Sequence, residues 1–536
     1  MHFERSSFLL LAVLVLAPAT ARAQNTYYVA PPPAGGDGQN GAQASPWATL
    51  QHAADTVAAG DTVIVLPGTY AGFNLETSGT ASAPIRFLAQ RGATIDRRNA
   101  TTPDGINLEG ASFVEIEGFT VNGTPRAGIR AVLCERVTIR NNVADRNERW
   151  GILTGFCDDL LIEGNRASNS VAEHGIYVSN SGDRPIIRGN TLFSNNANGI
   201  HMNGDASQGG DGIISGALVE RNIIYDNGTG GGSGINCDGV QDSRIQNNLI
   251  YDSHASGISL YQIDGGAPAR NNLIINNTVV VASDGRWALN IQDGSTGNRI
   301  YNNILINLHP SRGSIDISAD SLSAFSSDHN VLMDRLTTDG GNTILTMLEW
   351  RAATSQDANS LTATPAQLFR GFAQDDYHLA ANSPAIDEGR ATDAPPTDLE
   401  GTARSGAVDI GAFEVCGAGC IVDAGVTDAA TTDAATTDAG PGADVTPNAD
   451  ASAGTDAVTS ADAAGPGDAA GPADAAAAAD AAFGLDAGVS RDAGSTSGEA
   501  GCGCHSAGPS DARGSIGLAL VMLAMLASLA RGRGGP

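Results

Sequence analysis

The chain of 536 residues contains no lysine, so all 30 of its cationic side chains are arginines. This absence excludes every mechanism that needs a lysine amine as base or nucleophile. Acidic residues outnumber the arginines, since 59 Asp and Glu give a net charge of −29. Residues 421–500 contribute −13 of this charge through thirteen Asp, one Glu and one Arg. No basic patch indicates nucleic acid, and we expect no nucleic-acid partner.

The dipeptide Gly-Ile recurs at a nearly constant interval through the middle of the chain. The steps between copies are 23 or 24 residues, except for 35 residues after Gly199, and the repeat that follows the last copy begins 31 residues after Gly257. A repeat of this length is typical of one turn of a solenoid, and the two longer steps indicate turns that carry insertions. The copies begin at Gly105, Gly128, Gly151, Gly175, Gly199, Gly234 and Gly257.

A second register runs in phase with the first, because an Asn closes a short alternating run in each repeat. We expect this Asn at a sharp bend, where Asn tolerates the left-handed conformation and its amide stacks on the Asn of the next turn. Gly118 takes the same place one repeat earlier, which fits a conformational requirement. The Asn residues are Asn142, Asn165, Asn190, Asn222, Asn248, Asn277, Asn303 and Asn330.

Together the two registers predict an all-β fold, a right-handed, single-stranded parallel β-helix. Each repeat divides into three short strands, as in GIYVSN, PIIRG and TLFSN of residues 175–198. Upstream, Ser45-Pro46 and the helical spacing of Leu50, Ala53, Ala54 and Val57 predict a helix that covers the open end of the solenoid. We therefore assign residues 24–103 to this cap and the first turns, and 104–368 to the repeats.

The two registers, with the opening YYVA…SPWATLQHAADTVAAGDTVIVLPGTY, resemble the right-handed β-helix superfamily of pectate lyases, alginate lyases and chondroitinase-B-like enzymes. The resemblance covers roughly residues 27–335 and implies a polysaccharide partner in a groove along one strand face. Lyases of this kind often use Lys or Arg as base, and the Lys-based versions cannot operate here. A tethered module that binds polysaccharide or shapes the envelope without catalysis is the alternative.

Both ends of the chain indicate export and attachment to the cell surface. Residues 1–23 are typical of a cleaved secretory signal. Residues 369–420 are expected to form a C-terminal cap and resemble a module associated with surface attachment. Its acidic residues form either turn caps with an Arg-carboxylate clasp that closes the C-terminal turn, or a calcium cluster. Residues 421–500 have the composition of a disordered stalk. Residues 501–536 combine a Cys motif, a short hydrophobic segment and an Arg cluster, and resemble myxobacterial C-terminal sorting signals; an ordinary membrane anchor is the alternative.

Export permits disulfides, and the seven cysteines are interpreted accordingly. Cys134 and Cys157 each follow their Gly by six residues, so they should stack on adjacent turns, either as a disulfide or as two buried thiols. Cys416 and Cys420 are expected to close a small loop. Cys237 falls at an inward-facing strand position and is expected in the core.

Strand alternation places a row of polar side chains on one outer face of the solenoid. We predict His201 as catalytic base and Tyr177 as acid, with insertions after His201 and Tyr261 as walls of the groove. The alternative is a merely solvated strand face. The expected substrate contacts are Asn203, Asn236, Asp238, Tyr261, Trp150 and His174. If a calcium ion binds, its predicted ligands are Asp205, Asp211 and Asp238.

Overall fold

The computed structural model describes residues 24–404 and 406–415. The predicted signal at 1–23, the Cys416–Cys420 loop, the stalk at 421–500 and the segment 501–536 lie outside the described residues. Within the described ranges, no helix combines the length and the apolar character needed to cross a membrane.

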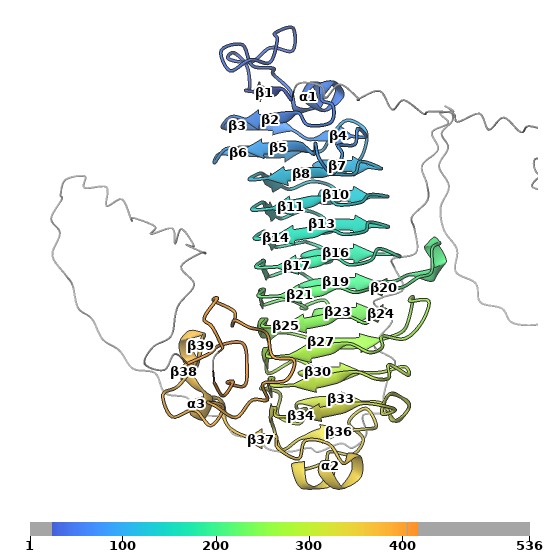
Figure 1. Cartoon of the computed structure of the whole chain (residues 1–536), viewed down its shortest axis with the longest axis vertical. Helices are drawn as coiled ribbons and strands as arrows, with labels where there is room; N and C mark the ends of the chain where they lie inside the picture. Colours follow the sequence, from blue (N-terminus) through green and yellow to red (C-terminus); the bar gives the residue numbers. More distant parts are fainter. Residues whose placement is uncertain (1–23, 405, 416–536) are drawn as a thin grey trace, which may run out of the picture. The chain divides into compact units, whose positions relative to one another are not determined.

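The described chain winds through three parallel sheets, and each turn adds one strand to each sheet in the same order (Figure 1). We number the sheets in the order in which the chain enters them. This arrangement confirms the predicted all-β parallel helix with three short strands per repeat. Because side chains alternate along each strand, every turn directs one set inward and one set outward.

The strands of sheet 1 are β1 (Thr26–Val29), β2 (Thr62–Val65), β5 (Ile85–Ala89), β8 (Val114–Glu117), β11 (Thr138–Arg140), β14 (Leu161–Glu163), β17 (Ile186–Arg188), β21 (Leu218–Glu220), β25 (Arg244–Gln246), β28 (Leu273–Ile275), β31 (Arg299–Tyr301) and β34 (Ser326–Asp328).

The strands of sheet 2 are β3 (Gly68–Ala71), β6 (Ala93–Arg97), β9 (Thr120–Asn122), β12 (Val143–Asp145), β15 (Arg166–Ser168), β18 (Thr191–Phe193), β22 (Ile223–Tyr225), β26 (Leu249–Ser253), β29 (Thr278–Val281), β32 (Ile304–Asn307), β35 (Val331–Leu332) and β37 (Leu361–Thr362).

The strands of sheet 3 are β4 (Phe73–Leu75), β7 (Ile106–Glu109), β10 (Ala127–Val132), β13 (Trp150–Gly155), β16 (Ile176–Ser179), β19 (Ile200–Asn203), β23 (Ser233–Asp238), β27 (Ser256–Tyr261), β30 (Leu289–Ile291), β33 (Ile315–Ile317) and β36 (Leu336–Thr337). Outside the three sheets, β20 (Ile214–Ser215) pairs with β24 (Val240–Gln241), and the short 3₁₀ helices η1 (Ala206–Gln208) and η2 (Ala319–Ser321) lie in connections.

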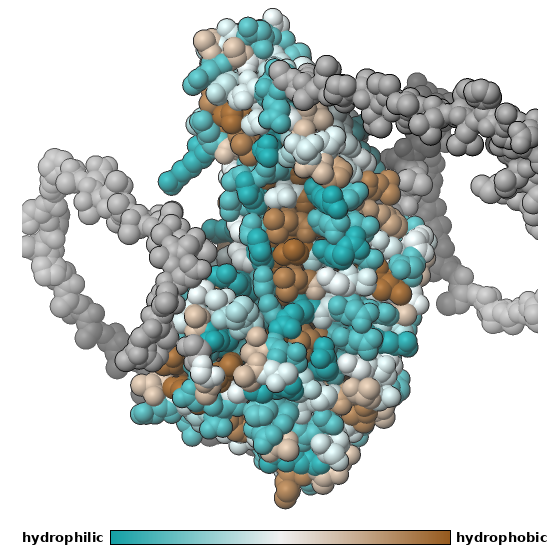
Figure 2. Space-filling model, viewed as in Figure 1, coloured by the Kyte–Doolittle hydropathy of each residue, from teal (hydrophilic) through white to brown (hydrophobic). Residues whose placement is uncertain are grey.

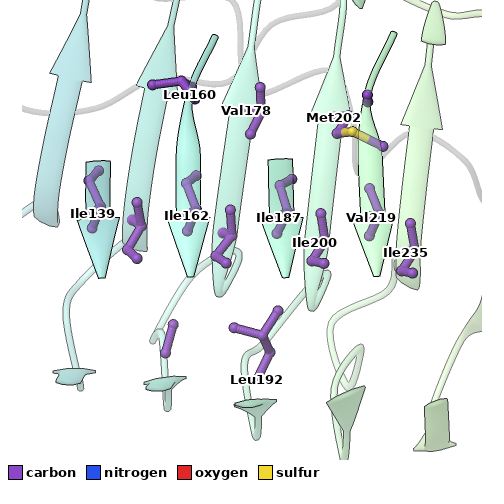
Figure 3. Close-up of a cluster of buried hydrophobic side chains, with 14 of the residues drawn as sticks. Ile139, Leu160, Ile162, Val178, Ile187, Leu192, Ile200, Met202, Val219 and Ile235 are labelled. Carbon is purple, nitrogen blue, oxygen red and sulfur yellow. The ribbon is translucent and has the colours of Figure 1, made fainter. Parts of the chain in front are cut away.

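The core is built from aliphatic side chains that stack in columns from turn to turn (Figure 3). Ile162 and Ile187 of sheet 1 face Ile200 and Ile235 of sheet 3, and all four are fully buried. The Gly of the Gly-Ile pairs is needed for close packing. A Cβ on Gly175 would lie 2.8 Å from the carbonyl oxygen of Gly199 and 2.8 Å from the side-chain amide of Asn195. The Gly-Ile repeat therefore marks the start of the sheet 3 strands.

The predicted Asn ladder forms, but the left-handed conformation belongs to the residue before each ladder Asn. In each step the Oδ1 of one Asn accepts from the backbone and side-chain amides of the Asn before it, at 3.0 and 2.9 Å between Asn190 and Asn222. Asn141 and Arg221, which precede ladder residues, have φ of 56° and 57°. Gly118 (φ 82°) matches these residues, and Phe119 takes the ladder place. The expectation that the ladder Asn itself adopts the bend was wrong, because its amide is engaged between turns.

Helices close both ends of the core. Helix α1 (Leu50–Thr56) begins at the N-cap Thr49 rather than at Ser45-Pro46, and buries Leu50, Ala53 and Ala54 against the first turns. Helix α2 (Met347–Thr354), which the sequence reasoning missed, buries Met347 and Trp350 in the same core at the other end (Figure 1). Its Thr346 and Glu349 form a reciprocal capping box.

The segment after the last turn, which includes the described residues of the predicted C-terminal cap, lies on the flank of the solenoid (Figure 1). It contains α3 (Pro365–Leu368), β38 (Phe369–Gly371), η3 (Phe372–Gln374) and β39 (Asp376–Leu379). Apolar residues of this segment pack on outward side chains of sheet 2. The bend residues Arg221, Asn247, Asn276 and Asn302 donate to its backbone carbonyls, for example from Asn276 Nδ2 to the oxygen of Asp409 at 3.0 Å. Its position thus depends on the same left-handed bends.

Cys134 and Cys157 lie on adjacent turns between sheet 3 and sheet 1 and are joined by a disulfide, the first of the two predicted alternatives. Their Cα atoms are 4.5 Å apart, close to the spacing of neighbouring strands. Cys237 is fully buried in the core, as expected from strand alternation.

Candidate functional site on the outer face of sheet 3

The predicted polar row exists in register along the outer face of sheet 3. Strand pairing aligns Tyr177 with His201, His201 with Asn236, and Asn236 with Ser259. The row continues to Asn290 and then to Asp316. A parallel row two residues on contains Ser179, Asn203, Asp238 and Tyr261. Alternation therefore gave the register and the direction of these side chains correctly.

The centre of the row, however, is buried, because neighbouring aromatic rings cover one another. Tyr177 is 2 % and His201 6 % exposed. The Tyr177 ring stacks on His201 on one side and on Trp150 on the other, with centroids 5.1 and 5.7 Å away. His174 packs edge-on against both Tyr177 and His201. The predicted substrate contacts Trp150 and His174 are thus parts of a packed cluster.

Hydrogen bonds assign the tautomers of the two histidines. The backbone amide of Asn198 donates to His174 Nδ1 at 3.3 Å, so the ring proton of His174 is on Nε2. His174 Nε2 lies 3.1 Å from His201 Nδ1, which must accept, so His201 carries its proton on Nε2. Burial lowers the pKa of His201 to about 3. Burial, with the charges of His201 and Arg149, holds the pKa of His174 well below its usual value.

In this geometry His201 offers no free lone pair, and its role as catalytic base stays a prediction. Its Nδ1 lone pair is already occupied by His174, and its Nε2 atom bears a proton and is buried. A base must offer a lone pair to the substrate within hydrogen-bond reach. The hydroxyl of Tyr177 accepts a hydrogen bond from the side-chain amide of Asn203 at 3.2 Å. The role of Tyr177 as acid stays a prediction.

The three predicted calcium ligands do not converge, because each aspartate caps a different turn. Asp238 accepts from the backbone amides of Ile263, Asp264 and Gly265 at 2.7 to 3.1 Å. Asp205 accepts from Ser207, and Asp211 accepts from Ile213. Within residues 24–404 and 406–415, no three His, Cys, Asp or Glu side chains are arranged to hold a metal ion. The ligand set was wrong because spacing alone does not separate a ligand from a turn cap.

Turn caps and an arginine clasp also account for the acidic residues of the flanking segment. Asp398 accepts from the backbone amides of Glu400, Thr402 and Glu414. Arg404 and Glu414 form a buried ion pair at 2.7 Å. This is the first of the two alternatives proposed for residues 369–420.

The accessible part of the face lies farther along the solenoid than predicted, beside the loop that follows β27. Asn236 donates to the hydroxyl of Tyr261 at 2.7 Å, which orients a ring that is only partly buried. On the next turn Gln292 donates to Asn290 Oδ1 at 2.8 Å, and both amides are partly exposed. The Asp238 cap holds the intervening loop in place and thereby positions Asp264.

Asp264 is the residue that sequence reasoning missed, although it lies in the insertion after Tyr261 that was predicted to form a wall. Its carboxylate accepts from Asn203 Nδ2 at 3.4 Å, and its carbonyl accepts from Ala206. Burial and the charge of Asp205 raise the pKa of Asp264. Asp205 has φ 29° and ψ 85°, a strained conformation of the kind that clusters at functional sites. Asp264 and Asn203 therefore meet at the edge of the face, and Asp205 is close enough for its charge to act on Asp264.

Comparison with known proteins supports this architecture. Residues 27–170 match the family described as Pel9A-like, right handed beta helix region, and residues 150–330 match the family described as right handed beta helix region. The solved structure of pectate lyase Pel9A is 17 % identical with a TM-score of 0.52, covering 73 % of this chain and 97 % of that one. No curated protein sequence matches.

Two further solved structures are less similar. An alginate lyase from Paenibacillus sp. str. FPU-7 is 20 % identical with a TM-score of 0.41, covering 55 % of this chain and 96 % of that one. A complex of XylC with xylose is 11 % identical with a TM-score of 0.48, covering 74 % and 99 %. The family matches, the likeness to Pel9A and the three parallel sheets agree that the chain is a right-handed parallel β-helix protein.

Proposed function

We propose that the protein binds a polysaccharide chain along the outer face of sheet 3, at the turns that carry Tyr261, Asn290 and Gln292. The observation that carries the proposal is the alignment of partly exposed phenol and amide groups on successive turns, about 5 Å apart. Sugar hydroxyls both donate and accept, so an amide row suits them. The likeness of the fold to that of the pectate lyase Pel9A supports a saccharide ligand.

Unsatisfied polar atoms on the neighbouring strand β19 support the same location. Asn203 Oδ1 and His201 Nε2 are buried and have no hydrogen-bond partner among the described residues. Buried polar groups without partners are rare in folded proteins and often mark functional sites. These atoms are two positions apart on β19, so they leave the strand on the same side, next to Tyr177 and Asp264.

Cleavage of the bound chain is a second candidate function, supported by the carboxylates at the edge of the face. A carboxyl whose pKa is raised holds its proton more readily, as a general acid must, and burial and the charge of Asp205 raise the pKa of Asp264. We assign Asp264 as the acid-base group of this candidate, in place of His201. Uronate-containing polymers are the substrates to test first, with and without a chelator for calcium.

We further propose that the protein is exported and tethered to the cell surface through its C-terminal region. The composition of residues 1–23 and of residues 421–536 supports this proposal. The disulfide between Cys134 and Cys157 supports it independently, because such bonds persist in oxidising compartments.

Binding is tested by calorimetric titration of a panel of acidic and neutral oligosaccharides. Asn290→Ala should weaken binding about ten-fold, through loss of hydrogen bonds to the ligand. Asn359→Ala, which removes an exposed amide away from sheet 3, is the matched control and should leave binding unchanged. Equal affinities for the two variants would rule out this face as the binding site.

Cleavage is tested on the same panel by absorbance of unsaturated uronides and by release of reducing ends. If any substrate is cleaved, Asp264→Asn should lower the rate by roughly 100-fold or more while leaving binding largely intact. Unchanged cleavage in Asp264→Asn would remove Asp264 from the mechanism but would leave the binding proposal standing.

A further inference from the structure

A shallow depression on the outer face of sheet 1 lies outside the site described above. Its volume is about 400 Å³. It is formed where three successive strands, β21, β25 and β28, and the bends before them meet β31. The lining residues that matter are Leu218, Leu273, Asp242, Asn271, Arg244 and Arg299.

The depression continues an apolar column on this face. Strand pairing stacks Leu161 on Ile186 and Ile186 on Leu218, and each of these side chains is partly exposed. In Figure 2 a narrow run of apolar residues with hydrophilic residues on either side lies along the middle of the visible face. Beyond Leu218 the next residue of the column is Arg244, and the one after it is Leu273, whose side chain is buried.

Two arginines flank Leu273 in the same column. Pairing aligns Arg244 with Leu273 and Leu273 with Arg299, which separates the arginines by two turns, or about 10 Å. Burial lowers the pKa of Arg244, the charge of Asp393 raises it, and the charge of Arg299 lowers it. The two guanidinium groups therefore repel each other.

The arginines differ in how far their hydrogen bonds are satisfied. Arg244 donates to Gln246 Oε1 and to the carbonyl oxygen of Asp393. Arg299 donates no hydrogen bond to any described residue, and its side chain is 45 % exposed. Its nearest carboxylate, that of Asp393, is 4.0 Å away. Arg299 thus presents donors to the depression that an external acceptor could use.

The rim of the depression supplies hydrogen-bond acceptors. Asp242 accepts from Asn271 Nδ2 at 3.2 Å, and both lie in bends at the edge of the depression. A ligand that fits this arrangement has an apolar face, hydroxyl groups and a carboxylate. The planar guanidinium of arginine matches a carboxylate with two parallel hydrogen bonds.

We propose that this depression is a second saccharide-binding site, specific for a sugar that carries a carboxylate. The carboxylate of one sugar binds Arg299, the apolar face of another sugar of the same chain packs on Leu218 about 15 Å away, and hydroxyl groups bond to Asp242. The site is on sheet 1, whereas the proposed function concerns sheet 3, so the two proposals stand or fall separately.

The test is calorimetric titration of the full chain with a short oligogalacturonate and with a neutral galacto-oligosaccharide of the same length. Arg299→Ala should weaken binding of the acidic ligand at this site about ten-fold, and added salt should weaken it further. The control Arg98→Ala removes one exposed charge away from the depression and should have no effect. Because Arg299 donates to no described residue, its replacement should leave the fold intact, which circular dichroism checks.

A second variant should change the affinity for the acidic ligand in the opposite direction. Asp393→Asn removes the carboxylate that competes for Arg299, so it should strengthen binding of the acidic ligand a few-fold. Equal affinities for Arg299→Ala and Arg98→Ala, or equal affinities for the acidic and neutral ligands, would overturn the proposal. Loss of binding in Asn290→Ala but not in Arg299→Ala would also overturn it, while supporting the site on sheet 3.

Discussion

His174 Nε2 and His201 Nδ1 lie 3.1 Å apart in a buried contact that keeps both imidazoles neutral. We predict that neither ring titrates between pH 5 and 8, because burial holds the pKa of His201 at about 3 and that of His174 well below its usual value. Imidazole nitrogen shifts measured by NMR across this range should stay constant for both residues. Titration of either ring near pH 6.5 would contradict the neutral pair.

His254 provides the internal contrast for this measurement. It bridges Asp284 and Asp226, at 2.9 and 3.1 Å, and these hydrogen bonds raise its pKa against the opposing effect of burial. Its ring should therefore titrate above pH 6.5 in the same spectra. The neutral pair also affects stability, since unfolding lets both rings bind protons below pH 6.5. Stability should fall below that pH by about 1.4 kcal/mol per pH unit for each histidine.

Asp316 lies at the far end of the sheet 3 row. Its effect on the pH dependence of stability is opposite to that of the two buried histidines. Burial raises its pKa to about 6, and its Oδ1 atom accepts no hydrogen bond from the described residues. The folded protein therefore binds this proton more tightly than the unfolded chain, whose Asp titrates near pH 3.8. This contribution to stability is complete below pH 3.8 and is lost as the pH rises through 6.

Asp316→Asn should stabilise the protein at pH 7 by about 2 kcal/mol, because the amide has no charge to bury. Urea unfolding of both proteins at pH 4 and pH 7 checks the sign. The gain should be absent at pH 4, where Asp316 is already protonated in the folded protein. A variant that is equally or less stable at pH 7 would show that the charged carboxylate is well accommodated.

Much of the fold could be predicted because a solenoid repeats its packing at a fixed interval. Gly175 and Asn190 recur in phase since each contacts its own equivalent on the next turn. The burial of His201 could not be predicted. Strand alternation shows that a side chain points outward, but it does not show whether other side chains pack over it. The side chains that bury this part of the face are Trp150, which stacks on Tyr177, and His174, which packs on His201. Their positions depend on tertiary packing. Asp264 was missed for the same reason, as its loop is fixed by Asp238.

The disulfide between Cys134 and Cys157 should stabilise the solenoid by restricting the unfolded chain. It closes a loop between residues 23 apart, for which chain entropy gives about 3 kcal/mol. The double variant Cys134→Ala with Cys157→Ala should lower the free energy of unfolding by that amount, and reducing agent should destabilise only the parent protein. Replacement of Cys237, which is fully buried and outside the pair, controls for loss of core volume. Equal sensitivity of both proteins to reductant would exclude this source of stability.

The Asn ladder should be the most sensitive polar feature of the fold. The Asn222 side chain donates to Ile187 and Asn248 and accepts from both amides of Asn190, and it is fully buried. Asn222→Ala leaves the partners on both turns unsatisfied, so we expect a loss of about 3 kcal/mol or more in the free energy of unfolding. Chemical denaturation followed by circular dichroism measures the change.

The control for the ladder is Asn342→Ala, which removes an exposed amide that bonds only to the carbonyl of Asp339 among the described residues. It should cost less than about 0.5 kcal/mol. Asn222→Asp is the sharper variant, because it keeps the shape and the Oδ1 acceptor but replaces the NH2 group, which donates two hydrogen bonds, with a second oxygen and adds a charge to a buried stack. It should destabilise the protein at least as much as Asn222→Ala at neutral pH. A small effect of Asn222→Asp would mean that the stack tolerates a missing donor. The regular recurrence of Asn at this position of each turn would then need another explanation.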